Sequence, residues 1–263
     1  MILVKIGGGE SINIEAVIAD LAKQDQPFII VHGANVLRDQ LAEKLGMEKT
    51  VLTSASGYTS VFSDKDAIDV IMMSYAGLRN KRIVELCQRS DINAVGLTGL
   101  DGRIVQGERN KGIRVRENGK TLIKRDFSGK PRSINTDLLR LMLDNGYCPV
   151  LTIPIVDENG FAINSENDDI IVQLAAALEI DTVIQLIQAP GFLDDAGDEA
   201  SLVERMSLVE LNTREAQVEG RIKRKLLALT RLCASGKTRV IITDGRGDHP
   251  VEDALNGKGT HIG

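Results

Sequence analysis

The chain has 263 residues, a formal net charge of −5, 43% hydrophobic and 26% charged residues, which is typical of one large globular domain or two small ones. Aromatic residues make up 3% and tryptophan is absent, so a base-stacking nucleic-acid platform is not favoured. No apolar run is long enough to span a membrane and no cleavable leader is apparent, so we expect a cytoplasmic protein. Neither the histidines nor Cys87, Cys148 and Cys233 have metal-ligand spacing, so we expect no metal site and three small core thiols.

The first ten residues, MILVKIGGGE, predict an anion-binding turn. Residues 2–6 are typical of a buried central strand, because apolar side chains lie on both of its faces. Residues 7–9 expose backbone N–H groups, and the apolar spacing over 14–21 predicts that a helix follows at once, whose N-terminus attracts phosphate. Lys5 is placed to reach the same anion. The alternative is a glycine turn that only joins a strand to a helix.

Strands and helices alternate along the rest of the chain. This alternation predicts an α/β fold, a three-layer αβα sandwich with an open, mainly parallel sheet. We expect a single domain with lobes of residues 1–165 and 166–263. In such sheets ligands bind at the carboxyl ends of the strands, where the glycine turns lie. The expected strands are 28–31, 94–97, 150–153, 183–187, 240–242 and 259–262, and the expected helices are 37–45, 68–75, 83–87, 136–145, 170–178 and 218–229.

The segment from Arg103 to Arg132 is strongly basic. It contains ten basic residues against three acidic ones, a local charge of +7 in a chain whose net charge is −5. Alternating apolar residues on either side of Asn118-Gly119 predict a β-hairpin in this segment. One interpretation is a solvated basic face, which is what most charge runs are. The other is a landing surface for an acidic partner.

The candidate chemistry follows from charge. Lys5 precedes the first glycine turn, Lys225 lies in the helix predicted at 218–229, and Asp168 belongs to a polar run, residues 164–169, that exceeds what a helix cap requires. No histidine or cysteine accompanies these residues. Phosphoryl transfer needs positioning and charge neutralisation rather than a covalent nucleophile. The pattern therefore favours phosphoryl transfer over acyl transfer or redox chemistry.

Several motifs resemble the amino acid kinase family, in order and across essentially the whole chain. Within that family the sequence is most similar to the acetylglutamate kinase branch. The GLDGR turn at 99–103, RDFSGK at 125–130 and GRIKRK at 220–225 resemble the carrier-protein-linked aminoadipate or glutamate kinases of lysine and arginine biosynthesis. The other motifs are Lys5-Ile6-Gly7-Gly8, Val31-His32-Gly33, GLTGLDG at 96–102, and Ile163-Asn164 with Asp168.

The resemblance implies a homodimeric kinase that uses ATP and Mg²⁺ to convert a side-chain carboxylate to an acyl phosphate, with 1–165 as the substrate lobe and 166–263 as the nucleotide lobe. It implies that Lys5 and Lys225 neutralise the transferring phosphoryl group and that Asp168 orients both lysines. The residues implied on the nucleotide side are Gly7, Gly8, Gln188, Gly191, Leu193 and Lys223. Those implied on the substrate side are Gly33, Ala34, Val61 and Asn164.

Ala34 and Val61 depart from the family pattern, which has a glycine and a substrate-binding arginine at these positions. Ala34 keeps its N–H, whereas Val61 removes a cation that would hold the α-carboxylate of the substrate. The main hypothesis is a kinase for carrier-bound aminoadipate or glutamate. The alternatives are a kinase for free N-acetylglutamate and a non-catalytic regulatory or binding homologue. Intact Lys5, Asp168 and Lys225 argue against the last alternative.

Overall fold

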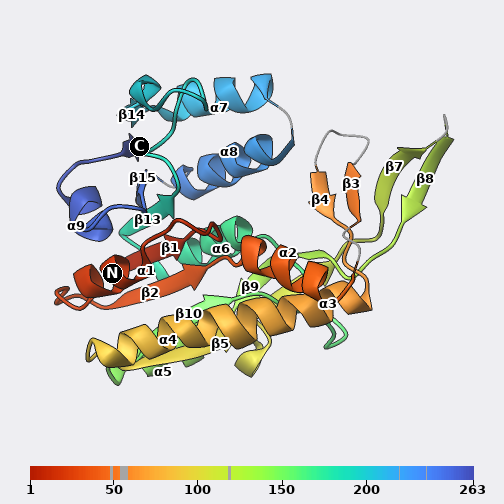
Figure 1. Cartoon of the computed structure of the whole chain (residues 1–263), viewed down its shortest axis with the longest axis horizontal. Coiled ribbons are helices and arrows are strands. Elements are labelled where there is room, and N and C mark those ends of the chain that lie inside the picture. Colours follow the sequence, from red (N-terminus) through yellow and green to blue (C-terminus); the bar gives the residue numbers. More distant parts are fainter. Residues whose placement is uncertain (48–49, 54–58, 118–119, 219, 235) are drawn as a thin grey trace.

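The computed structural model of the chain is a three-layer αβα sandwich built on one eight-stranded sheet (Figure 1). It describes residues 1–263 except 48–49, 54–58, 118–119, 219 and 235. In spatial order the strands are β14 (Arg205–Met206), β16 (Thr260–Ile262), β15 (Arg239–Asp244), β13 (Thr182–Ile187), β1 (Ile2–Ile6), β2 (Phe28–His32), β10 (Cys148–Thr152) and β5 (Ala94–Thr98). Neighbours from β15 to β5 are parallel, and β16 runs antiparallel to β15. The predicted fold class is therefore confirmed.

The central strand β1 is buried on both faces because its side chains alternate between two apolar clusters. Ile2, Val4 and Ile6 belong to one cluster and Leu3 to the other. A helix layer covers each face, which explains why every side chain of the strand except Lys5 is apolar. The first layer is α1 (Ile14–Leu21), α4 (Asn80–Arg89) and α9 (Pro250–Leu255), and the second is α5 (Thr136–Asp144), α6 (Asn167–Leu178) and α8 (Gly220–Cys233).

The helices predicted at 68–75 and 83–87 form one continuous helix. It consists of α3 (Lys65–Ile71), a π-helical segment η1 (Met72–Arg79) and α4. The wider π turns shift the helical phase. As a result Ile68 and Tyr75 pack in the cluster of the second layer, whereas Ile83 and Cys87 pack in that of the first.

Other elements also differ from the sequence expectation. α1 does not follow Gly9 at once but begins at Ile14, because the Asn13 side chain caps it by accepting from the Ala16 N–H at 3.1 Å. The three cysteines are buried free thiols, as expected.

In the described ranges no helix is long and apolar enough to cross a bilayer. The remaining helices are α2 (Asn35–Lys44), predicted from the sequence, and α7 (Leu208–Gln217), η2 (Asp101–Arg103) and η3 (Glu199–Ser201), which were not predicted.

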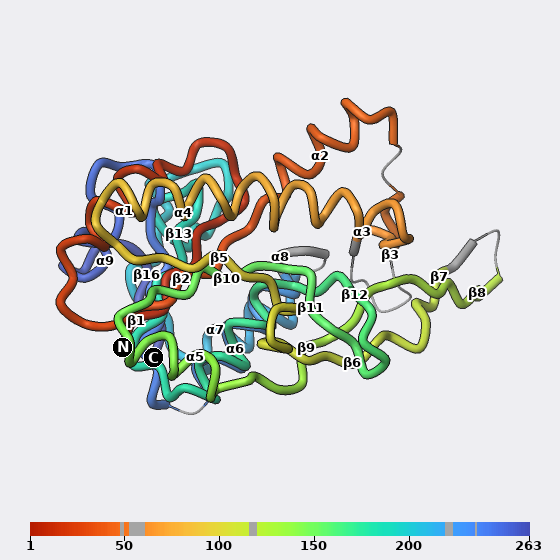
Figure 2. The backbone as a smooth tube through the Cα atoms, turned by 90° about the horizontal axis from the view of Figure 1, so that it is seen from below, coloured from red at the N-terminus to blue at the C-terminus, as the bar shows by residue number. Residues whose placement is uncertain are grey.

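A small second sheet and two hairpins lie beyond the main sheet. The hairpins project from the same end of the molecule (Figures 1 and 2). The strands of the predicted basic hairpin are confirmed as β7 (Ile113–Glu117) and β8 (Lys120–Lys124), and its Asn118-Gly119 turn lies outside the described residues. The second sheet has the order β12 (Ala162–Ile163), β11 (Ile155–Val156), β6 (Val105–Arg109) and β9 (Gly129–Ile134), and the hairpins are β3 (Val51–Thr53) with β4 (Thr59–Val61) and β7 (Ile113–Glu117) with β8 (Lys120–Lys124).

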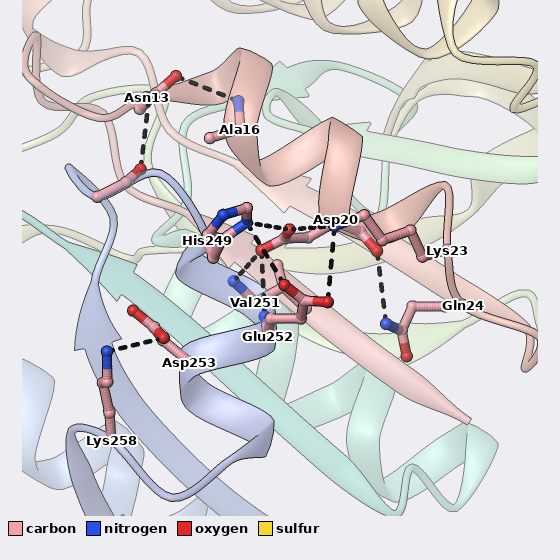
Figure 3. A network of polar contacts seen from close by, with 11 residues as sticks. Asn13, Ala16, Asp20, Lys23, Gln24, His249, Val251, Glu252, Asp253 and Lys258 are labelled. Carbon is pink, nitrogen blue, oxygen red and sulfur yellow. Dashed lines mark hydrogen bonds and ion pairs between the residues drawn. The ribbon is translucent and has the colours of Figure 1, made fainter.

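A buried carboxylate on α1 caps the N-terminus of α9 (Figure 3). Asp20 is fully buried, and its Oδ2 accepts from the N–H groups of Val251 at 3.0 Å and Glu252 at 3.1 Å. His249 is the residue at the cap position and makes no side-chain cap bond of its own. Asp20 therefore satisfies helix N–H groups that α9 cannot satisfy locally.

We predict that Asp20→Ala lowers the free energy of unfolding by about 2 kcal/mol or more, because charge-assisted bonds to two helix N–H groups are lost in a buried place. Urea unfolding measures the change. Glu15→Ala, at an exposed position on the same helix, is the control and is expected to change stability by less than about 0.5 kcal/mol. Equal effects of the two substitutions would contradict the capping role.

Candidate active site

A cleft of about 490 Å³ lies at the carboxyl ends of β1, β2 and β13. Its walls come from both predicted lobes, which share the single large sheet. Glycine turns follow β1 and β2 at this edge, as the sequence predicted. The predicted site residues that line the cleft are Lys5, Gly7, Gly8, Gly33, Val61, Asn164, Asp168, Gln188 and Lys225.

An ion pair between Lys5 and Asp168 lies in the cleft. Lys5 Nζ donates to Asp168 Oδ1 at 2.6 Å, and the side chains are 10% and 15% exposed. Burial by itself would raise the pKa of Asp168, but the charge and hydrogen bond of Lys5, together with the charge of Lys225, bring this pKa below its ordinary value. Asp168 also lies in the first turn of α6, where a negative charge is favoured. An ionised carboxylate therefore holds positive charge at this end of the cleft.

The two glycine turns meet in the floor of the cleft. A Cβ on Gly33 would lie 2.9 Å from the amide nitrogen of Gly8, so this contact excludes a side chain. The N–H of Gly7 donates to the Leu186 carbonyl at 3.1 Å and so is used within the sheet rather than for a ligand. In the described part of the chain, no backbone acceptor is bonded to the N–H of Gly8 or Gly9. These two amides are the donors that the turn offers to an anion.

Asn164 joins the cleft to the base of the hairpins. Its Nδ2 donates to Ser63 Oγ at 2.9 Å, and the Ser63 N–H donates to Asp126 Oδ2 at 3.0 Å. Asp126 is buried, and its Oδ1 accepts from Ser128 Oγ at 2.6 Å. The segments that follow β4, β8 and β12 are thus tied together. Val61, the last residue of β4, faces the cleft beside this network.

His32 lies at the end of β2, directly before Gly33, and is fully buried. Its carbonyl accepts from Thr152 Oγ1 and from Asn167 Nδ2, both at 3.0 Å. Its ring Nε2 lies 3.1 Å from the Asn80 amide nitrogen. Because an amide nitrogen can only donate, Nε2 must accept, and the ring proton is assigned to Nδ1. Burial lowers the pKa of His32 to about 3. The neutral ring therefore links the second glycine turn to the long helix that contains Asn80.

Some predicted site residues do not line the cleft. Ala34 is buried at the cap position of α2. The turn around Gly191 packs on Thr260, and the N–H of Phe192 donates to Thr260 Oγ1 at 2.7 Å. Lys223 Nζ lies 4.0 Å from Glu215 on α7. Their binding roles stay predictions. The residues concerned are Ala34, Gly191, Leu193 and Lys223.

The cleft also contains residues that the sequence analysis did not single out. Arg224 on α8 forms an ion pair with Glu166, the cap residue of α6, which fixes α8 beside Asp168. The excess of polar groups at 164–169 was the available signal for Glu166. Arg224 lies in the GRIKRK motif, whereas the remaining residues come to the cleft through tertiary packing, for which the sequence offers no local pattern. The added residues include Asn35, Arg38, Tyr75, Glu166 and Arg224.

We predict that acid weakens the fold through His32. Its pKa is about 3 in the folded chain and about 6.5 when unfolded, so the unfolded state binds more protons between these values and stability falls as the pH drops below about 6.5. The loss is about 1 kcal/mol between about pH 7 and about pH 5.5. Urea unfolding of wild type and His32→Gln at both pH values measures it. The slope is expected to flatten in His32→Gln but not in the control His249→Gln, and an unchanged slope in the first variant would contradict the assignment.

Known sequences are similar to this chain over most or all of its length. The profile of the amino acid kinase family matches residues 1–244. The chain is 41% identical to LysW-aminoadipate kinase of Deinococcus radiodurans, over 100% of this chain and 91% of that protein. It is 39% identical to LysW-aminoadipate kinase of Thermus thermophilus, over 100% of both chains. It is 29% identical to acetylglutamate kinase of Methanopyrus kandleri, again over 100% of both.

Solved structures share the fold at lower identity. N-acetylglutamate synthase of Neisseria gonorrhoeae superposes with a TM-score of 0.78 at 20% identity, over 99% of this chain and 58% of that one. The carbamate kinase of Giardia superposes with a TM-score of 0.68 at 15% identity, over 99% of this chain and 97% of that one. With the family profile spanning both glycine turns, Asp168 and Lys225, the chain belongs to the amino acid kinase family.

Proposed function

We propose that this protein is a kinase that transfers the γ-phosphoryl group of ATP to the side-chain carboxylate of aminoadipate or glutamate carried on an acidic carrier protein. The observation that carries the proposal is the group of Lys5, Lys225 and Asp168 beside the free amides of the first glycine turn. This group offers positive charge and N–H donors, and its one carboxylate is paired with Lys5. Such a site suits direct transfer between two bound substrates.

The reaction needs no general base, because a side-chain carboxylate is already ionised at neutral pH. One of its oxygens attacks the γ-phosphorus, the bond from that phosphorus to the β–γ bridging oxygen breaks, and ADP leaves. Lys5 and Lys225 neutralise the charge that spreads over the phosphoryl oxygens, and Asp168 keeps Lys5 in place. The Gly8 and Gly9 amides donate to phosphate oxygens in the same cleft.

Mg²⁺ belongs to this proposal as an ion that enters with the nucleotide. The cleft carboxylates are already paired, Asp168 with Lys5 and Glu166 with Arg224, so they do not form a separate cage for a cation. Mg²⁺ is commonly held by substrate phosphates and water, which fits such a site. The ion supplies charge neutralisation on the phosphates.

The proposal also covers the arrangement of the chain. Residues 1–165 form the acceptor side and 166–263 the nucleotide side, and the active form is a homodimer.

A carrier-bound acceptor is favoured by the relatives and by the basic hairpin. The names of the Deinococcus and Thermus relatives describe aminoadipate joined to LysW. The side chains of Arg114 on β7 and Lys120 on β8 are exposed. Arg109, at the base of the hairpin, instead stacks on Phe127, with its Cζ 3.9 Å from the ring centroid. The second candidate is phosphorylation of free N-acetylglutamate, which the similarity to the Methanopyrus acetylglutamate kinase favours.

We predict that Lys5→Ala and Lys225→Ala each lower kcat by about 10²-fold or more, because each removes charge at the transferring phosphoryl group. Coupled ADP release with carrier-linked aminoadipate, carrier-linked glutamate and N-acetylglutamate measures the rate and identifies the acceptor. Lys258→Ala, at an exposed lysine paired with Asp253, is the control. If either active-site variant keeps near wild-type kcat while the fold is intact, its assigned role is wrong.

We predict that kcat/KM for a carrier-linked acceptor falls steeply with salt, because complementary charged surfaces speed association and the Debye length is about 8 Å at physiological ionic strength. Reversing the charges of Arg114 and Lys120 reduces kcat/KM at low salt and leaves the KM for ATP unchanged. Arg140→Glu on α5 is the control for a general change of net charge. A weak salt dependence with no effect of the reversals would favour the free-acceptor candidate.

A further inference from the structure

We propose that Arg38, on the first turn of α2, binds the second carboxylate of the acceptor, the one that is not phosphorylated, and so helps to select acidic amino acids. This inference rests on the proposed function and deepens it by assigning a residue to the acceptor. An acidic amino acid whose amino group is blocked presents two carboxylates. One must lie at Lys5 and Lys225 to receive the phosphoryl group, and the other needs a separate counter-charge.

Among the described residues, the cations that line the cleft are Lys5, Arg38, Arg224 and Lys225. Lys5 is paired with Asp168, and the charge of Lys225 acts on the same carboxylate. Arg224 is paired with Glu166. Lys5, Lys225 and Arg224 are thus committed to the phosphoryl end or to the α6 cap. Among the described cations of the cleft, Arg38 stands apart from that group. Val61, in the wall of the same cleft, brings no charge.

The position of Arg38 suits a ligand contact. Its N–H donates to the Ala34 carbonyl at 2.8 Å, so it lies one turn after the second glycine turn. Its charge acts on the hydroxyl of Tyr75, another cleft residue, where burial raises the pKa and the cation opposes the rise. Arg38 and Tyr75 both line the cleft. Its side chain is 13% exposed, so a carboxylate bound to it is largely removed from water.

The guanidinium of Arg38 keeps donors for a ligand. Its Nε and Nη2 donate to the neighbouring Asp39 Oδ1 at 2.8 and 2.6 Å. Among the described residues, none accepts a bond from Nη1. Asp39 holds one edge of the planar group and orients the rest, which is the arrangement that makes arginine a selective carboxylate binder.

The test compares two acceptors, aminoadipate joined through its amino group to the carrier protein and the same conjugate with its α-carboxylate converted to a carboxamide. Wild type is expected to have a KM about 10- to 100-fold lower for the carboxylate form, as fits one charge-assisted contact. Arg38→Gln raises the KM for the carboxylate form to that of the carboxamide form, and the KM for ATP stays unchanged. Arg38→Gln with Val61→Arg regains part of the preference, because a cation returns to the same cleft.

Arg82→Gln, at an exposed arginine paired with Glu85, is the matched control, and it keeps wild-type discrimination. Asp39→Asn tests a purely structural role, and the proposal expects it to keep most of the preference. If Arg38→Gln distinguishes the two acceptors as well as wild type does, Arg38 does not bind this carboxylate. If wild type phosphorylates neither conjugate nor free N-acetylglutamate, the proposed function fails, and the role of Arg38 fails with it.

Discussion

The buried ion pair between Lys5 and Asp168 is the interaction on which the site depends. It joins the central strand to the start of α6, segments far apart in the chain, through one bond of 2.6 Å. Neither group could be buried alone, since breaking such a pair costs about 3 to 5 kcal/mol. The pair therefore ties correct assembly of the sheet and the second helix layer to the presence of positive charge in the cleft. The same fold that buries this pair therefore places its lysine in the cleft.

The surroundings of the pair divide into a rigid floor and variable walls. The floor is made by strand ends and by two glycine turns so close that neither admits a side chain at the contact. The walls come from α2, from β4 and from the π-helical segment of the long helix. The phosphoryl group is the same for every acceptor, so the residues that bind it can belong to the rigid floor. Selection of the acceptor suits the walls, where sequence changes leave the sheet intact.

Much of this organisation could be predicted from the sequence. Apolar runs ending in glycine identified the sheet and the edge at which Lys5, Gly8, Gly33 and Asp168 meet. The π-helical segment and α7 were missed, because periodicity reasoning assumes a regular 3.6-residue repeat and a strong apolar stripe. Arg38 was missed for a different reason. An arginine among the polar residues of a helix is ordinary in a sequence, and only the tertiary fold brings it to the same cleft as Val61.

The π-helical segment Met72–Arg79 has a consequence for how the protein tolerates changes in length. An α-helix turns by roughly 100° per residue, so deleting a single residue there would rotate α4 against α3 by about that angle. Ile83 would then leave the first apolar cluster, or Tyr75 would leave the cleft. The wide turns thus act as a spacer that keeps two faces of one helix in phase with two different cores. Along this helix, the number of residues is a stricter constraint than the identity of most of them.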